Sequence, residues 1–157
     1  MARFNIDGLQ PVIDDMRRLG AECSEAAEAM ILTGAEVVRQ AWQRSAEEHG
    51  LRDTGAMIAS IGYPRHARDI GGQLAIDIYP QGKDARGVRN AEKAFIAHYG
   101  TSTHAATYWV DDADRYCDPA VVEAMAAIWE EYIATGVVPT VSIPAGVGSG
   151  ATGITKT

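Results

Sequence analysis

The fold is decided by residues 21–49, which read AECSEAAEAMILTGAEVVRQAWQRSAEEH. Apolar or small side chains recur every three or four positions there, and most carboxylates fall on the other side. The first set is Ala27, Ile31, Gly34, Val38, Ala41 and Ser45, and the second is Glu22, Glu25, Glu28, Glu36, Glu47 and Glu48. This period predicts an amphipathic helix that Gly50 closes. Gly34 and Ala41 on the apolar stripe would let another backbone approach closely.

Before this helix, a first helix over residues 10–19 is expected to end at Gly20. After it, a turn over 54–60 leads into a small sheet. Leu74, Ile76 and Ile78 alternate with more polar positions, as they do in a half-buried strand. The predicted strands are 58–63 and 73–79, with loop 64–70 between them and Pro80 after the second.

Two more helices are expected, over residues 90–99 and 108–135. The second should break or restart at Asp118-Pro119, because a residue before proline avoids the helical region, and Gly136 should end it. The fold class is therefore α+β: a small, mainly antiparallel sheet packed on a long N-terminal helix and a C-terminal helix. Residues 1–136 form one domain. Residues 137–157, rich in Gly, Ser and Thr, form an extended C-terminal arm that cannot make its own core.

Composition narrows the class of protein. The chain has 157 residues, 46% of them hydrophobic and 22% charged, which is ordinary for a globular domain. No apolar run reaches the roughly 20 residues of a membrane span, and residues 1–7 do not read as a signal peptide. We expect a protein that is made in the cytoplasm, with Cys23 and Cys117 as free thiols.

The net charge of −7 is unevenly spread. Segment 62–90 holds five basic side chains against three aspartates, so the rest of the chain is strongly acidic. An acidic body argues against binding to duplex DNA. Three interpretations of the segment stay open: solvated loop charge, contact with an acidic protein ring, or contact with nucleic acid. Its basic side chains are Arg65, Arg68, Lys83, Arg86 and Arg89.

No pattern in the chain predicts an enzyme, a metal or a cofactor. The aspartates at 111, 112, 114 and 118 lack calcium-loop spacing and suit the start of a helix. The four histidines form no zinc motif. The glycines at 146, 148 and 150 lack the strand and helix that flank a phosphate loop. A dyad of His98 with Cys117 or Ser102 stays open, because catalytic groups need only be close in space.

Three segments, in order, resemble one phage protein family. Residues 51–65 read LRDTGAMIASIGYPR and are similar to its Thr-Gly-x-Leu-x-x-Ser-Ile element. Tyr99-Gly100-Thr101-Ser102 is similar to its Gly-Thr-Ser turn, and residues 108–113 to its aromatic-then-alanine helix start. The family is the tail-completion, or neck, proteins of long-tailed siphophages, the lambdoid-type "putative tail component" family. The chain departs from the pattern at His98 and in its longer tail.

The resemblance implies a structural virion protein of the neck or tail, without catalytic activity. Such proteins form a homo-oligomeric ring, sixfold by expectation, between the head-side connector or stopper and the tail terminator or tube. DNA passes through the channel only as cargo. The contacts between subunits or rings are then expected at Arg65, Arg68, Lys83, Arg86, Arg89, Val141, Ile143 and Ile154. The alternative is a small phage-encoded nucleic-acid-binding or host-directed protein that uses segment 62–90.

Overall fold

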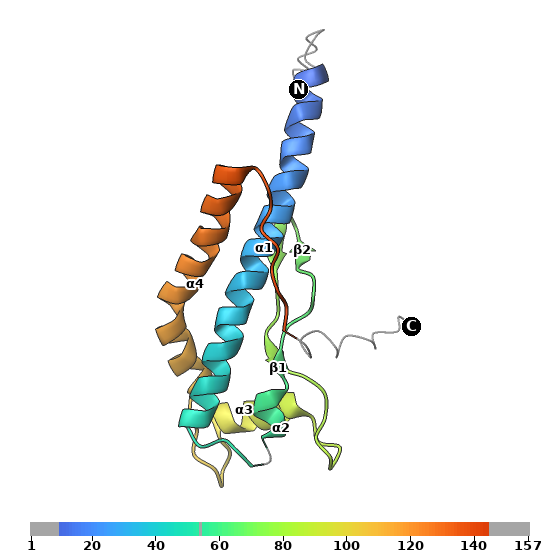
Figure 1. Cartoon of the computed structure of the whole chain (residues 1–157). Coiled ribbons are helices and arrows are strands. Elements are labelled where there is room, and N and C mark those ends of the chain that lie inside the picture. Colours follow the sequence, from blue (N-terminus) through green and yellow to red (C-terminus); the bar gives the residue numbers. More distant parts are fainter. Residues whose placement is uncertain (1–9, 54, 145–157) are drawn as a thin grey trace, which may run out of the picture.

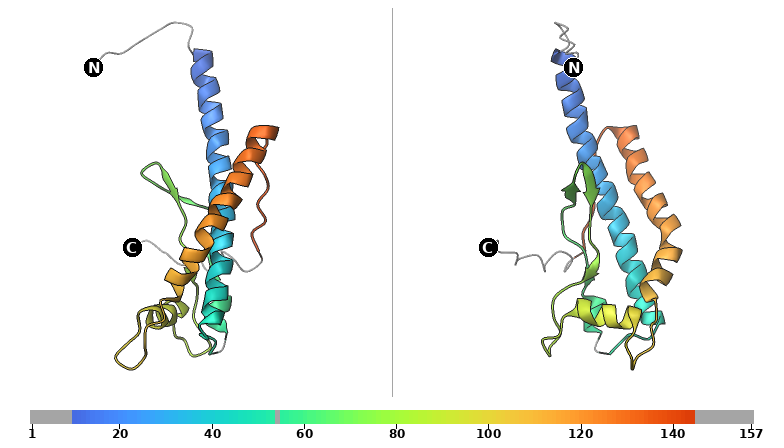
Figure 2. Two further views of the ribbon diagram at one scale, coloured as in Figure 1. Left: turned by 90° about the vertical axis from the view of Figure 1, so that its left-hand side faces the viewer. Right: turned by 180° about the vertical axis from the view of Figure 1, so that it is seen from behind.

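The computed structural model describes residues 10–53 and 55–144. Two long helices, α1 (Gln10–Glu48) and α4 (Trp109–Thr135), lie side by side (Figure 1). The strands lie on the side of α1 away from α4, and two short helices lie at one end of the pair, here called the base (Figures 1 and 2). The fold is α+β, as the sequence predicts. The remaining elements are α2 (Ala56–Ala59), β1 (Ile61–Gly62), β2 (Arg68–Ile70), β3 (Gln73–Ala75), β4 (Tyr79–Pro80) and α3 (Asn90–Tyr99).

Helix α1 runs further than the sequence predicts. The expected stop at Gly20 is wrong, because the helix continues through it and Gly20 is not among the glycines with positive φ. Glycine in a helix costs only about 1 kcal/mol relative to alanine, so neighbouring turns can carry the helix across it. The helix ends as predicted near Gly50, whose φ is 69°. There the Leu51 amide donates to the Ala46 carbonyl at 3.0 Å.

The strand region differs most from the prediction. The expected strand 58–63 begins as α2, and only Ile61–Gly62 is extended. The expected strand 73–79 is two strands, because β3 pairs antiparallel with β2 and β4 pairs antiparallel with β1. Strand β2 occupies the last three residues of the expected loop 64–70, and Pro80 is the last residue of β4 rather than the residue after the strand. The result is two separate two-stranded sheets.

Helix α3 matches the predicted range and is followed by a tight turn at Gly100. A Cβ added at Gly100 would lie 2.6 Å from the His104 carbonyl oxygen, and φ there is 74°. Helix α4 then runs without a break through Pro119, so the predicted interruption is wrong. Pro119 is exposed. The Arg115 carbonyl, which loses its helical partner at Pro119, therefore lies on the solvent side, where it is open to water.

The core has two parts, one at the base and one beside the strands. Trp109 is fully buried in the first, where the Trp42 ring meets it edge-on at 5.6 Å. Tyr63 is fully buried in the second, against Leu32 and Ala35 of α1. The base cluster consists of Ala46, Met57, Ile58, Ile61, Ala94 and Trp109.

Gly34 lies where α1 and α4 pack together. A Cβ there would meet Met125 Sδ at 3.1 Å and Val121 Cγ1 at 3.3 Å. The sequence predicted close approach of another backbone at this glycine, whereas the atoms that approach it are side-chain atoms of α4. This contact limits how closely α4 can approach α1.

Candidate functional site

The basic side chains of segment 82–89 are presented by a turn that Asp84 organises. We call Lys83, Arg86, Val88 and Arg89 the basic turn; all four are exposed. One Asp84 oxygen accepts the Arg86 and Val88 amides, each at 2.9 Å, and the other lies 2.5 Å from Lys93 Nζ. The hydrogen bond from Lys93, together with those two amides, lowers the pKa of Asp84 to about 2. The carboxylate therefore stays ionised and keeps the turn in one shape.

The other two predicted arginines lie near the β2–β3 hairpin. Arg68 makes an ion pair with Asp77 across it, and Arg65 is exposed in the loop before β2. Arg86 of the basic turn also has partners, Asp53 at 2.8 Å and Asp84 at 3.8 Å. The structure thus separates the five predicted basic residues into two places, and two of them already face carboxylates.

The arm residues Val141 and Ile143 pack on their own chain. After α4, residues 137–144 turn back and run along α1 (Figure 1). Both side chains are half-buried against the Leu32, Ala35 and Tyr63 cluster. This segment has a core contact that the sequence did not predict, because its partners are distant in the chain. The intersubunit role expected of Val141 and Ile143 stays a prediction, and Ile154 lies outside the described residues.

The cluster around Tyr63 borders a half-buried ionic network. The Tyr63 hydroxyl donates to Glu36 Oε2 at 2.9 Å, and Arg39 donates to both Glu36 oxygens. Burial by itself raises the Glu36 pKa, but hydrogen bonds from Arg39, Gln40 and Tyr63 outweigh it and leave that pKa lowered. Burial, followed by the bond to Glu36, raises the pKa of Tyr63. Each group thus keeps its ordinary charge state, and the network holds the strand side onto α1.

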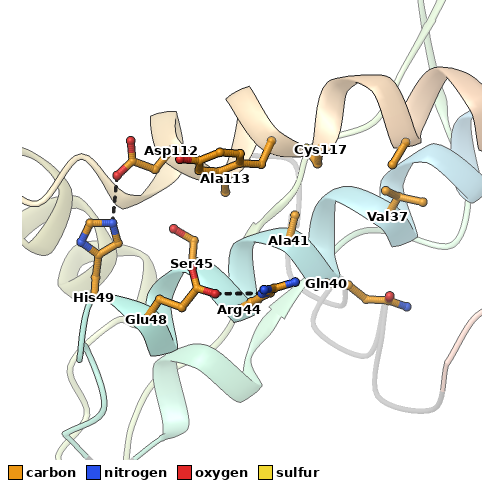
Figure 3. A pocket seen from close by; sticks show the side chains of 12 residues that line it. Val37, Gln40, Ala41, Arg44, Ser45, Glu48, His49, Asp112, Ala113 and Cys117 are labelled. Carbon is orange, nitrogen blue, oxygen red and sulfur yellow. Dashed lines mark hydrogen bonds and ion pairs between the residues drawn. The ribbon is translucent and has the colours of Figure 1, made fainter.

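A groove of about 640 Å³ runs between α1 and the start of α4 (Figure 3). At its mouth His49 Nε2 lies 3.0 Å from Asp112 Oδ2, an arrangement that would orient a catalytic histidine. The possible nucleophiles nearby are occupied or inactive. Ser45 Oγ donates to the Trp109 carbonyl at 2.6 Å, and burial, reinforced by Asp114 and Asp118, raises the pKa of the Cys117 thiol. Neither Ser45 nor Cys117 is therefore activated as a nucleophile by the groups that surround it here.

The dyad that the sequence left open at His98 does not form. His98 is buried, and Nδ1 accepts the Val110 amide at 3.4 Å while Nε2 lies 3.6 Å from Asp111. Its ring also packs edge-on against Tyr99 and Tyr108. Within the described residues, neither Cys117 nor Ser102 is among its contacts. His98 therefore joins the end of α3 to the start of α4.

Around His98 lies an exposed aromatic surface that sequence reasoning missed. Phe95 is 63% exposed, Tyr99 59% and Tyr108 52%, and the Phe95 and Tyr99 rings lie 4.7 Å apart. Tyr108 has a positive φ of 51° without being glycine, so its backbone is held in a costly conformation. The sequence feature that could have predicted this surface is the presence of three aromatic residues on one short helix and the loop after it. We call Phe95, Ile96, Tyr99 and Tyr108 the aromatic surface.

The segments that carry the family resemblance build the fold. Met57 and Ile58 are buried, and the Ser60 hydroxyl donates to the Met57 carbonyl at 2.7 Å where α2 ends. Gly100 makes the turn that only glycine fits, and Trp109 fills the base cluster. Thr54 lies outside the described residues. These motifs thus specify structure at the base of the molecule rather than a reactive site.

Two classes of site are not found where the structure describes the chain. Across residues 10–53 and 55–144, no three His, Cys, Asp or Glu side chains gather as a metal site. Over the same ranges, no helix combines the length and apolarity that a membrane crossing requires. Comparison with protein-family models, with curated proteins and with solved structures yields no match.

Proposed function

We propose that this chain is a structural virion protein of a phage neck or tail. Copies of it form a ring at the head–tail junction that completes or joins the tail and leaves a channel for DNA. The proposal contains no catalytic step and no cofactor. It rests on the ordered resemblance of residues 51–65, 99–102 and 108–113, and the α+β architecture is the one that the resemblance implies.

The observation that carries the proposal is the amount of large apolar surface left in solvent. The aromatic surface lies at the base of the molecule, and Val122, Ile133 and Val137 are each at least 65% exposed along and just beyond α4. Contiguous exposed apolar side chains on a small chain mark contact sites for other proteins. Two such areas on different faces suit a subunit that contacts its neighbours in the ring and also an adjacent ring.

Within this proposal, the aromatic surface contacts the next ring along the axis. It lies across the end of the helix pair, where α3 is placed (Figure 1). Aromatic side chains supply large contact area with few rotatable bonds, and they are enriched at the centres of interfaces. The partners expected there are the head-side connector or stopper, or the tail terminator or tube.

The test is electron microscopy of lysates from a phage with an early stop codon in this gene, complemented by plasmid copies. Without complementation we expect full heads and tails that do not join, or tails of aberrant form. The wild-type copy should restore joined particles. A Phe95→Ser, Tyr99→Ser copy should not, whereas Tyr116→Ser, which removes a 79% exposed aromatic ring elsewhere, should. Normal infectious particles from the uncomplemented phage would refute the proposal.

The alternative function, nucleic-acid binding through segment 62–90, is weakened by the ion pairs of Arg68 and Arg86 with aspartates. A paired guanidinium must lose its carboxylate before it can neutralise a phosphate. The two functions differ in salt dependence. A nucleic-acid-binding protein should bind single-stranded DNA or RNA with an affinity that falls steeply as salt rises, and a ring subunit should show no measurable binding.

A further inference from the structure

The outer side of α4 carries a continuous exposed row that changes character along its length. Asp111 and Asp118 lie at its start, and Val122, Trp129 and Ile133 follow at helical spacing with Ala126 among them. Side chains three, four, seven and eleven positions apart share one side of a helix. All six are exposed, whereas Ala113, Cys117 and Tyr132 point into the protein. We call this row the outer face of α4. It is apolar toward the end away from the base and acidic toward the base, where the exposed Arg115 lies between the two aspartates but pairs with Asp112 at 3.7 Å.

The strand side of the molecule has a surface of complementary character. Toward the base it presents the basic turn, in which Val88 is 40% exposed among Lys83, Arg86 and Arg89. Further from the base it presents the β2–β3 hairpin, whose first strand is exposed throughout and ends at Ile70, 56% exposed. The hairpin projects away from the helix pair (Figure 2). A two-stranded hairpin of this length is barely stable in water by itself, so it gains from a surface to pack on.

The two surfaces lie on opposite sides of α1 and run in the same order. In Figure 1, α4 is on one side and the strands are on the other, and the view from behind in Figure 2 agrees. The basic turn and the acidic start of α4 are both toward the base, while the hairpin and the apolar part of α4 are both further from it. Surfaces that match in charge and order but face in opposite directions cannot meet within one chain, but they can meet between two copies.

We propose that the strand side of one copy docks on the outer face of α4 of a second copy, head to tail. Ile70 and the hairpin pack against Val122, Trp129 and Ile133, and Lys83 and Arg89 of the basic turn face Asp111 and Asp118, while Arg86 keeps its ion pairs within its own chain. This inference rests on the proposed function, since it names the lateral contact of the proposed ring. In such a contact, every dimer still has one free strand side and one free outer face of α4. Further copies can therefore add until the ring closes.

The two halves of this contact have different roles. Exposed ion pairs contribute little affinity, so burial of the apolar half supplies most of the binding. The charged half sets direction and register, because a shifted or reversed copy would move Asp111 and Asp118 away from Lys83 and Arg89. Asp84 supports this half, since it holds the basic turn in one shape before docking and reduces the ordering that association requires.

Charge reversal in the purified full-length protein tests the contact. Arg89→Glu and Asp118→Arg should each weaken self-association by roughly tenfold or more, measured by sedimentation and light scattering. Mixing the two variants, or combining both changes in one chain, should restore it because each reversed charge again meets its opposite. The matched controls are Arg44→Glu and Glu47→Arg, which reverse exposed charges on α1. Association that survives both test variants would overturn the inference.

Cross-linking tests the same contact even when self-association is weak, because it captures short-lived complexes covalently. In a Cys23→Ser background, a chain with both Arg89→Cys and Asp118→Cys should give a ladder of multimers with a short bismaleimide. Chains with either change alone should stay single, and a mixture of the two should give dimers. Dimers from the Asp118→Cys chain alone would indicate a symmetric α4 contact, and no cross-links in any sample would mean no such contact. Either result overturns the inference.

The particle phenotype keeps this inference separate from the proposed function. If charge reversal abolishes association while the stop-codon phage still makes normal particles, the contact is right and the neck function is wrong. If the stop-codon phage fails to join heads and tails while particles carrying Arg89→Glu join normally, the function is right and the contact lies elsewhere.

Discussion

Because α1 packs closely against α4 at Gly34, a small side chain there should stabilise the protein and a large one should destabilise it. A methyl group at this position would meet the Met125 side chain at 3.1 Å and 3.3 Å and Val121 at 3.3 Å. These contacts are tight, but the closest one is with the end of a flexible side chain. Replacing glycine with alanine in a helix gains about 1 kcal/mol, and a shift of Met125 should cost a few tenths of that gain.

Gly34→Ala should therefore stabilise the protein by about 0.5 kcal/mol. Gly34→Leu brings three more carbon atoms into the same space, and overpacking of this kind costs about 1–3 kcal/mol. After the gain in helix propensity, we expect a net loss of about 1–2 kcal/mol. For a chain of this length, 1 kcal/mol corresponds to about 2–4 °C in Tm. The alanine variant should melt slightly above the wild type, and the leucine variant several degrees below it.

Urea titration followed by circular dichroism, with thermal melts on the same samples, measures both variants. The protein concentration is kept low and constant so that self-association does not alter the apparent stability. A leucine variant as stable as the wild type would mean that α4 does not pack closely on α1 at this point. An alanine variant less stable than the wild type by more than about 1 kcal/mol would mean that Met125 cannot move aside.

Three further changes test other parts of the structure. Tyr63→Phe should cost about 1 kcal/mol, because the half-buried Glu36 carboxylate loses a donor at 2.9 Å; the loss is read from urea midpoints. The pKa of Asp84 lies at about 2 in the folded protein against 3.8 ordinarily, so its stabilising effect is full above pH 4 and lost as pH falls toward 2. Asp84→Asn should remove that part of the acid dependence of stability. Gly100→Ala should cost well over the roughly 1–3 kcal/mol of an ordinary strained backbone conformation, because φ 74° and ψ −177° lie in a region that is essentially restricted to glycine and the added Cβ would lie 2.6 Å from a carbonyl oxygen. Gly87→Ala is its control, since φ is also positive there but nothing lies within 4 Å.

The helices and turns that depend on residues close in sequence could be predicted from the sequence. The 3.6-residue period over residues 21–49 indicated the helix, and Gly34 and Ala41 on its stripe indicated a close neighbour. The range of α3 and the end of α4 before Gly136 followed in the same way. The charge of segment 62–90 pointed to its exposed side chains, though not to the aspartates that some of them face.

Tertiary contacts decided the rest. Leu74, Ile76 and Ile78 alternate as one strand would, yet β3 and β4 belong to different sheets because their partners β2 and β1 lie elsewhere in the chain. Val141 and Ile143 lie in a segment without periodicity, and only the cluster around Tyr63 explains their burial. The aromatic surface and the outer face of α4 are likewise defined by what the fold leaves uncovered. Local spacing determines which side of a helix is apolar, but the sheet pairings, the burial of the arm and the exposed faces depend on residues far away in sequence.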